Sequence, residues 1–474
     1  MNATRSISPR SVAVLAACAL LLLAFAPAQY FGRQQDDLLY FIGARALTMG
    51  RYCLLTDPAC PPLTMINPLW PALLSPLALI TERPGPFQAL SALLLAAVPL
   101  VLWAWLRRRT GETQALLAAA LFASSPLVFS QSGTVMSEAP FTLALLGMLL
   151  ALDAGRPLSA GLSAAALLLT RTAGVAALPA LLSPLLKKTR PRDAAKLLLP
   201  PALSFGAWCA WSWSRARTVE KFDMFSLTYG AAPLSKLARV VASNARFYAS
   251  EWGSSFLPSG LASGRLSVVL GGALGAVVLF GLTRVLRKRR DDAAAWTLLA
   301  TALMLGVWGW QYERYLIPLL PLLLWALCEG LGKASARALG ALLVLQLCAQ
   351  TLPRLGRPGP WSEPELAKTY AWLAARPAPA LLSSAEPVRD GWLCGLASRP
   401  LPLASSDEAF AKALKSARID FVLRVDGLDY GLNEDASASP RLAVEAAYRR
   451  LENPALFIKV HEEPSERAEV YAPR

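Results

Sequence analysis

The apolar segment SVAVLAACALLLLAFAPA (residues 11–28) is followed after a few residues by QQDDLLY (residues 34–40). The first stretch has the length and composition of a membrane-spanning helix, because about 20 apolar residues cross a bilayer. Two adjacent carboxylates, Asp36 and Asp37, therefore come just after the point where the chain would leave the lipid. Carboxylates are expensive inside hydrocarbon and tend to mark functional positions. These two features together predict a membrane protein with an acidic pair at the membrane surface.

The composition also indicates a membrane protein with several spans. Of the 474 residues, 55% are hydrophobic and 17% are charged. Ordinary soluble domains are less apolar and contain about 25% charged residues. A net charge of +15 is also typical of nucleic-acid-binding proteins, but here the Lys and Arg residues occur in short clusters between apolar runs. Such clusters indicate membrane topology.

The basic clusters predict a polytopic α-helical topology, because cytoplasmic loops are rich in Lys and Arg. Placing the N-terminus inside puts every cluster in the cytoplasm and requires about eleven spans. The clusters are Arg5 with Arg10, Arg107 to Arg109, Lys187 to Arg192, Arg284 to Arg290, and Lys333 with Arg337. The expected spans are 11–28, 88–106, 113–131, 139–153, 158–170, 173–186, 195–214, 266–283, 293–310, 315–331 and 335–352.

The same topology assigns the loops to sides of the membrane. It places outside the residues at about 29–87, 132–138 and 215–265 and everything after 352. The acidic pair is therefore expected to be extracytoplasmic, in a multi-pass protein of a bacterial plasma membrane. As an alternative, residues 11–26 form the apolar part of a signal peptide that is cleaved near Ala26-Pro27-Ala28.

The character of the chain changes at about residue 353, where apolar spans stop and charged and turn-forming residues become frequent. We therefore expect a transmembrane domain over 1–352 and a small soluble extracytoplasmic α/β domain over 353–474. The elements expected in the second domain are strands at 421–425 and 456–460 and helices at 408–416 and 441–451.

Cysteine and histidine usage limits the chemistry. Cys53 and Cys60 share the first outside loop, where an oxidising compartment allows a short disulfide; two free thiols are the alternative. The single histidine, His461, lies beside Glu462 and Glu463 and is expected on the solvated surface. No Gly-rich phosphate loop, CxxC zinc pattern or nucleophile elbow occurs. The chemistry is therefore expected to depend on carboxylates, arginines, hydroxyls and aromatics. No cofactor is assigned, and a divalent metal is left open.

Several short motifs carry a resemblance to a known family. They are Asp36-Asp37-x-x-Tyr40 with the following residues 44–50, Asn67-Pro68-Leu69, Ser137-Glu138-Ala139-Pro140-Phe141, Thr170-Arg171, and Arg314-Tyr315-x-x-Pro318. In their order and spacing the chain resembles the GT-C glycosyltransferases, in particular the branch of protein O-mannosyltransferases and aminoarabinose transferases. The resemblance covers nearly the whole chain. It implies transfer of a sugar from a polyprenyl-phosphate donor to a lipid, glycan or protein acceptor on the outer face, generally with inversion.

The resemblance also implies catalytic residues. Asp36 matches the catalytic acid, Asp37 is its neighbour in orientation or in an exchanged role, and Glu138 matches a second acidic position near the same site. Taken without the resemblance, the pair is equally typical of a helix N-cap. In the same way, Glu138 is typical of a charge that favours the start of a helix.

Two arginines are the expected phosphate contacts, because a phosphate at the membrane surface calls for charge-assisted hydrogen bonds. Arg314 lies between tyrosines at the outer end of a span, and Arg171 lies at an outer turn. Tyr40, Tyr315 and Asn67 complete the expected donor-binding set. The structural alternatives are an interfacial arginine that snorkels and an arginine that caps a turn.

The chain departs from the family at positions near the phosphate. Leu39 and Asn67 stand where some relatives have an arginine and a lysine, so the relatives' sugar and acceptor do not carry over to this chain. The stretch 221–229 is a further candidate for the site lining. The alternative function is a polytopic transporter or flippase, which would place ionisable groups at mid-membrane on broken helices, often in repeated halves. In this chain the acids lie at the outer ends of spans, and no repeat occurs.

Overall fold

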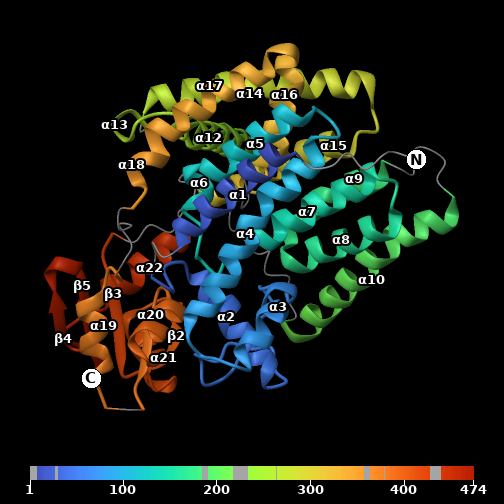
Figure 1. Cartoon of the computed structure of the whole chain (residues 1–474). Coiled ribbons are helices and arrows are strands. Elements are labelled where there is room, and N and C mark those ends of the chain that lie inside the picture. Colours follow the sequence, from blue (N-terminus) through green and yellow to red (C-terminus); the bar gives the residue numbers. More distant parts are fainter. Residues whose placement is uncertain are drawn as a thin grey trace.

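The computed structural model describes residues 8–26, 30–183, 190–216, 233–262, 264–356, 363–377, 379–427 and 439–474. A large helical body is followed by a small unit with a sheet, which lies at the lower left of Figure 1. The expected fold class, helical with a small C-terminal α/β part, is confirmed at this level. The domain boundary near residue 353 stays a prediction.

The helical body contains helices of very different length. Its elements are α1 (Pro9–Ala24), α2 (Gln35–Thr48), α3 (Leu69–Ala78), α4 (Pro84–Leu106), α5 (Glu112–Ser124), α6 (Pro126–Phe129), α7 (Glu138–Asp153), α8 (Pro157–Thr170), η2 (Thr172–Ala177), α9 (Leu178–Leu182), α10 (Pro191–Ala216), α12 (Pro233–Ser254), α13 (Ser259–Ala262), α14 (Arg265–Lys288), α15 (Ala293–Val307), η4 (Glu313–Leu316), α16 (Leu320–Leu331), η5 (Gly332–Ala334), α17 (Ser335–Gln346), η6 (Leu347–Thr351) and α18 (Leu352–Arg354).

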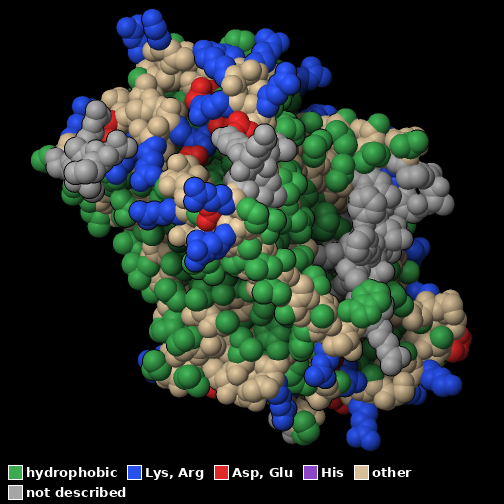
Figure 2. Space-filling model, turned by 90° about the vertical axis from the view of Figure 1, so that its right-hand side faces the viewer, with side chains coloured by type: hydrophobic (Ala, Val, Ile, Leu, Met, Phe, Trp, Pro, Cys, Tyr) green, Lys and Arg blue, Asp and Glu red, His purple; other side chains and the backbone are tan. Residues whose placement is uncertain are grey.

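Three helical stretches in the described residues are long and apolar enough to cross a membrane: Pro84–Leu106, Arg265–Lys288 and Leu320–Arg354. Shorter apolar helices accompany them, including Pro9–Ala24 and Ala293–Val307. Figure 2 shows hydrophobic side chains over much of the middle of one face, with Lys and Arg mainly in its upper part and at its lower edge. This distribution is that of a membrane protein, while the number of eleven spans stays a prediction.

Three expected spans are interrupted. The span expected at 315–331 begins in the 3₁₀ turn η4 and becomes α-helical only at Leu320, where α16 starts. The span expected at 113–131 is divided, because Ser125 is extended and precedes Pro126, and the residue before a proline disfavours the α conformation. The span expected at 173–186 begins as a 3₁₀ turn, η2, and continues as the short helix α9. The rest of this last segment, from 184 to 186, lies outside the described residues.

The C-terminal unit is built on a five-stranded sheet with the order β2-β1-β3-β5-β4. The first three strands pair in parallel, and β5 joins β3 and β4 antiparallel. The strands are β1 (Leu381–Ser384), β2 (Ala397–Pro400), β3 (Phe421–Val425), β4 (Phe457–Glu463) and β5 (Ala468–Pro473), and the helices are α19 (Ala367–Ala374), α20 (Pro387–Cys394), α21 (Asp407–Ser416) and α22 (Ser439–Arg450). The strands and helices expected from the apolar pattern coincide with β3, β4, α21 and α22.

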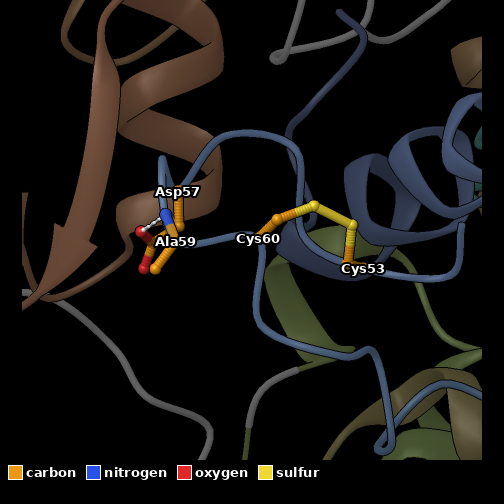
Figure 3. Close-up of a disulfide and its surroundings, with 4 residues drawn as sticks. All are labelled: Cys53, Asp57, Ala59 and Cys60. Carbon is orange, nitrogen blue, oxygen red and sulfur yellow. Dashed lines mark hydrogen bonds between the residues drawn. A yellow bond between two sulfur atoms is a disulfide. The ribbon is translucent and has the colours of Figure 1, made fainter.

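The first loop of the helical body holds the C-terminal unit in place. Cys53 and Cys60 form a disulfide that closes a short loop (Figure 3). In this loop the Thr56 carbonyl accepts a hydrogen bond of 2.9 Å from the Ser398 amide. Asp57 accepts one of 3.1 Å from the Arg399 guanidinium.

Aromatic packing of α20 adds to the same junction. The Trp392 ring lies edge-on to Phe41 of α2 at 5.1 Å and to Phe31 at 6.2 Å. Edge-to-face pairs at such distances are favourable beyond their burial. Helix α2, which starts with the acidic pair, is therefore packed directly against the C-terminal unit.

Candidate active site

The first turn of α2 sends its two aspartates in different directions. The helix begins at Gln35 after the extended residue Gln34, and carboxylates in a first turn interact favourably with the helix dipole. Neighbouring residues on a helix point about 100° apart. As a result Asp36 lines a cavity, whereas Asp37 is 1% exposed and lies in the protein interior.

Asp36 forms an ion pair across the cavity wall. Its Oδ2 accepts a hydrogen bond of 2.8 Å from Nη2 of Arg314, and its side chain is 35% exposed. The same guanidinium donates to Oε1 of Gln34. Arg314 itself is buried and comes from the short turn η4. The two residues that the sequence motifs single out most strongly therefore meet, although they lie far apart in the chain.

Asp37 has a different environment. Its Oδ2 accepts a hydrogen bond of 3.2 Å from the Gly32 amide, while its Oδ1 is buried without a hydrogen-bond partner. Burial raises the pKa of Asp37 to about 8, because the charged form loses its hydration. At neutral pH this carboxyl is therefore mostly protonated, which leaves Asp36 as the carboxylate that faces the cavity.

A second ion pair extends the charged surface of the cavity. Nη1 of Arg171 lies 2.5 Å from Oε1 of Glu138, which is the first residue of α7. The same oxygen lies 3.7 Å from Nε of Arg314. The four side chains thus alternate in charge in the order Asp36, Arg314, Glu138 and Arg171. Each guanidinium already has a fixed place and an opposite charge beside it, which keeps both cations in a low-dielectric setting.

Tyrosines lie beside these four charged side chains, which we call the charged row. The Arg314 guanidinium lies 4.5 Å from the ring centroid of Tyr312 and 5.8 Å from that of Tyr315. Arg171 lies 5.6 Å from the Tyr315 ring. The Tyr40 hydroxyl shares a hydrogen bond of 2.7 Å with the Ser137 hydroxyl, next to Glu138. Cation–π contacts of this kind hold guanidinium planes in one orientation.

Asn67 also lines the cavity, but its polar atoms are already engaged. Its Nδ2 donates a hydrogen bond of 2.6 Å to the Leu168 carbonyl, and its Oδ1 accepts one of 3.1 Å from the Thr172 hydroxyl. Asn67 therefore joins the first loop to the turn that carries Arg171. Its observed role is to position that turn.

The segment from Trp308 to Arg314 carries one wall of the cavity. Trp308 and Tyr312 have extended backbone, and successive side chains of an extended segment alternate between two faces. The lining residues of the extended part are, in agreement with that alternation, Trp308, Trp310 and Tyr312, and Arg314 follows them in η4.

The opposite face of this segment is held by α12. Nδ2 of Asn244 donates to the carbonyls of Leu305, Gly306 and Trp308 at 2.9, 3.0 and 2.8 Å. Its Oδ1 accepts a hydrogen bond of 2.9 Å from Gln311. Asn244 is fully buried and so satisfies the carbonyls at the buried end of α15. The position of Arg314 depends on this anchor.

The cavity has a volume of about 660 Å³ and a lining of two chemical kinds. One kind is charged and comprises the four side chains of the row and Glu386, which comes with Ala385 from the C-terminal unit. The other kind is apolar and comes mainly from α7, α8, η2 and α15. The apolar lining comprises Phe141, Leu145, Leu167, Val175, Ala176, Met304 and Leu305.

Among the residues that the structure describes, no group of three His, Cys, Asp or Glu side chains comes together in a way that would hold a metal ion. His461 stacks on Trp372 in the C-terminal unit, with ring centroids 4.6 Å apart. The candidate lining stretch 221–229 lies outside the described residues. The sequence reasoning missed Trp308, Trp310 and Glu386, of which the first two were assigned to a span.

Comparison with known proteins supports the fold. No family model and no curated protein sequence matches the chain. Among solved structures, ArnT from Cupriavidus metallidurans bound to undecaprenyl phosphate has a TM-score of 0.64 and 10% identity, and the match covers 98% of both chains. The oligosaccharyltransferase of Archaeoglobus fulgidus has a TM-score of 0.55 and 12% identity, with 87% of this chain and 68% of that chain covered.

A second structure of the archaeal enzyme, tethered to an acceptor peptide, has a TM-score of 0.52 and 14% identity, with 88% of this chain and 69% of that chain covered. At such identities the likeness shows the fold alone. The resemblance expected from the sequence motifs is thereby confirmed at the level of the fold. The chain has the fold of the GT-C glycosyltransferases.

Proposed function

We propose that this protein is an integral membrane glycosyltransferase that moves a sugar from a polyprenyl-phosphate donor to an acceptor on the extracytoplasmic face. The observation that carries the proposal is the cavity itself, which combines a row of carboxylates and arginines with an extensive apolar lining. A polyprenyl-phosphate sugar has the same two-part character. The similar fold of ArnT, solved with undecaprenyl phosphate, supports this assignment.

In this proposal the arginines hold the donor phosphate. Arg314 and Arg171 both line the cavity, together with apolar side chains. A guanidinium binds phosphate oxygens through paired hydrogen bonds in a fixed plane. The isoprenoid chain would then lie along α7, α8, η2 and α15, where apolar side chains replace water.

Asp36 is the proposed general base. The acceptor oxygen attacks the anomeric carbon, Asp36 takes the proton of the acceptor hydroxyl, and the bond between that carbon and the phosphate oxygen breaks. The electron pair leaves with the polyprenyl phosphate, whose charge the arginines compensate. Attack from the side opposite to the leaving group inverts the anomeric configuration. A phosphate leaving group needs no general acid, so a single base is sufficient.

The ion pair between Asp36 and Arg314 connects binding of the donor to deprotonation of the acceptor. The Arg314 guanidinium lies 2.8 Å from the Asp36 carboxylate. A bound phosphate competes for the same guanidinium and so weakens its hold on Asp36. Binding of the donor thus prepares Asp36 to accept a proton from the acceptor.

The substitution Asp36→Asn tests the proposal, because it removes the base and keeps the shape of the side chain. General bases contribute about 10²–10⁴-fold to rates, so a loss of at least 10²-fold in transfer is expected. Glycolipids and glycoproteins are compared between membranes with wild type, the variant and no protein, after labelling with radioactive sugars. Asp193→Asn is a matched control, since Asp193 is a partly exposed carboxylate beside Lys196 on α10.

Binding of undecaprenyl phosphate to the purified full chain completes the test. Asp36→Asn should bind this lipid at least as well as wild type does, because it removes a negative charge next to Arg314. Identical glycan profiles in all membranes would refute glycosyl transfer. Sugar-lipid movement across vesicles without any transfer would instead favour the transporter or flippase.

A further inference from the structure

Glu386 brings a charged side chain from the C-terminal unit into the cavity. It follows strand β1 by two residues and precedes α20, and together with Ala385 it forms that unit's share of the lining. As the N-cap residue of α20, its side chain makes no capping hydrogen bond to the helix. The carboxylate therefore does not cap the helix.

A buried network holds this carboxylate in one place. Arg389 forms an ion pair with Glu386, and its Nε donates a hydrogen bond of 3.2 Å to Oδ1 of Asp390. Asp390 is 2% exposed and also accepts a hydrogen bond of 2.7 Å from the Tyr370 hydroxyl. The Glu386 side chain keeps 23% of its surface exposed, on the cavity. A fixed acceptor of this kind has the properties of a recognition group.

Aromatic rings of the helical body line the same cavity as Glu386. Trp310 and Tyr312 come from the segment that also carries Arg314. Burial raises the pKa of Tyr312, and the carboxylates of Asp36 and Glu386 raise it further, which places this tyrosine near both acids. Trp308 extends the aromatic surface, with its ring 5.6 Å from that of Trp310.

The combination of a carboxylate and aromatic rings defines a class of ligand. A carboxylate accepts charge-assisted hydrogen bonds from hydroxyl groups and repels a phosphate. The face of an indole or phenol ring packs against the C–H groups of a ring that carries hydroxyls at its edge. Asp36, where the proposed reaction takes place, lines the same cavity.

We propose that Glu386, Trp310 and Tyr312 form a carbohydrate subsite, which binds a hydroxyl-rich ring without negative charge in the cavity that Asp36 lines. This inference rests on the proposed function and names the class of group that the site selects. The ring is either the sugar of the donor or a carbohydrate acceptor. The C-terminal unit thereby takes part directly in substrate selection.

The test measures binding of simple glycosides to the full chain in lipid nanodiscs. Methyl glycosides of mannose, glucose, galactose and arabinose are titrated and followed by saturation-transfer difference NMR. Glu386→Ala should weaken the preferred glycoside about tenfold or more, the usual effect of losing a hydrogen bond to a charged group. Trp310→Ala changes a residue of the helical body and should weaken binding of the same glycoside. This variant therefore distinguishes loss of the subsite from displacement of the C-terminal unit.

Two controls make the outcome specific. Glu408→Gln changes an exposed carboxylate of the same unit and should leave glycoside binding unchanged. Undecaprenyl phosphate should bind equally to wild type, Glu386→Ala and Glu408→Gln, because the subsite does not contact the phosphate. Failure of this lipid to bind wild type would count against the proposed function, whereas unchanged glycoside binding in both subsite variants would overturn the subsite alone.

Glycosylated carriers distinguish the two sources of the ring. Affinities are measured for undecaprenyl phosphate mannose, glucose and arabinose beside the bare carrier. If the subsite holds the donor sugar, Glu386→Ala removes the extra affinity of a glycosylated carrier. If it holds the acceptor, that affinity is retained and only the affinity for free glycosides falls. No change in either affinity would refute the subsite.

Discussion

The substitution Asp37→Asn gives the most direct test of how the two aspartates differ in protonation and in role. Burial raises the pKa of Asp37 from its ordinary value of 3.8 to about 8 in the folded protein. The folded state therefore binds a proton more tightly than the unfolded state does. The stability linked to this proton is complete below pH 3.8 and is lost progressively as the pH rises through about 8.

The size of the effect follows from the proton linkage. Between the two pKa values the wild type loses up to about 1.4 kcal/mol of unfolding free energy per pH unit, because only the folded state keeps the proton. Asparagine has no proton to lose and fills the same space. Between pH 5 and pH 8 the variant should therefore gain up to about 4 kcal/mol relative to wild type.

Thermal unfolding of the purified protein in detergent, measured at pH 5, 6, 7 and 8, checks this prediction. At about 2 °C per kcal/mol, the Tm of Asp37→Asn should rise relative to wild type by several degrees across the series. Asp193→Asn, a surface change, should give a constant difference. A constant difference for Asp37→Asn as well, or one that narrows with pH, would refute the assignment of a buried, protonated carboxyl.

Activity adds a second criterion to the same variant. Asp37→Asn should keep sugar transfer within about tenfold of wild type, whereas Asp36→Asn should lose at least 10²-fold, as expected for a general base. The opposite order would show that Asp37 takes the proton.

Three further predictions concern the supports of the site. Arg314→Gln should weaken undecaprenyl phosphate binding about tenfold or more, with Arg314→Lys intermediate, and equal affinity in both variants would contradict phosphate contact. Asn244→Ala should lower stability by about 2 kcal/mol and reduce transfer, because buried carbonyls lose their donor; an unchanged Tm would exclude this anchor. Replacing Cys53 and Cys60 by serine should cost about 2 kcal/mol and speed limited proteolysis of the C-terminal unit, and equal cleavage rates would show that the disulfide loop does not hold that unit.

Local motifs in the sequence selected four charged residues that the structure brings together. Asp36, Glu138, Arg171 and Arg314 were each weak candidates alone, but the structure brings them into one row with contacts of 2.5 to 3.7 Å. Glu386 could not be chosen in this way. Its place in the cavity depends on how the C-terminal unit docks on the first loop, and no local pattern encodes that docking.

Hydropathy predicted the membrane character of the chain better than it predicted the individual helices. Apolar runs of similar composition became a long helix at Pro84–Leu106 and a broken pair at Glu112–Ser124 and Pro126–Phe129. A single proline after Ser125 decides the difference, since backbone sterics end the helix while the composition stays apolar. Average hydrophobicity does not detect such a break. Hydropathy alone therefore does not determine the individual helices around residues 113–186.

The aromatic wall shows a signal that the sequence did contain. In Trp308-Gly309-Trp310-Gln311-Tyr312-Glu313-Arg314, aromatic residues and the arginine occupy every second position. This is the period of an extended segment with one distinctive face. Assigning residues up to 310 to a helix hid that period, because helical residues two apart point to different sides. In the structure α15 ends at Val307, so the alternation places Trp308, Trp310 and Tyr312 along one wall of the cavity, and Arg314 follows in the turn η4. A period of two that directly follows an apolar helix, and that ends in an arginine, is therefore a pattern by which such a wall can be recognised from sequence.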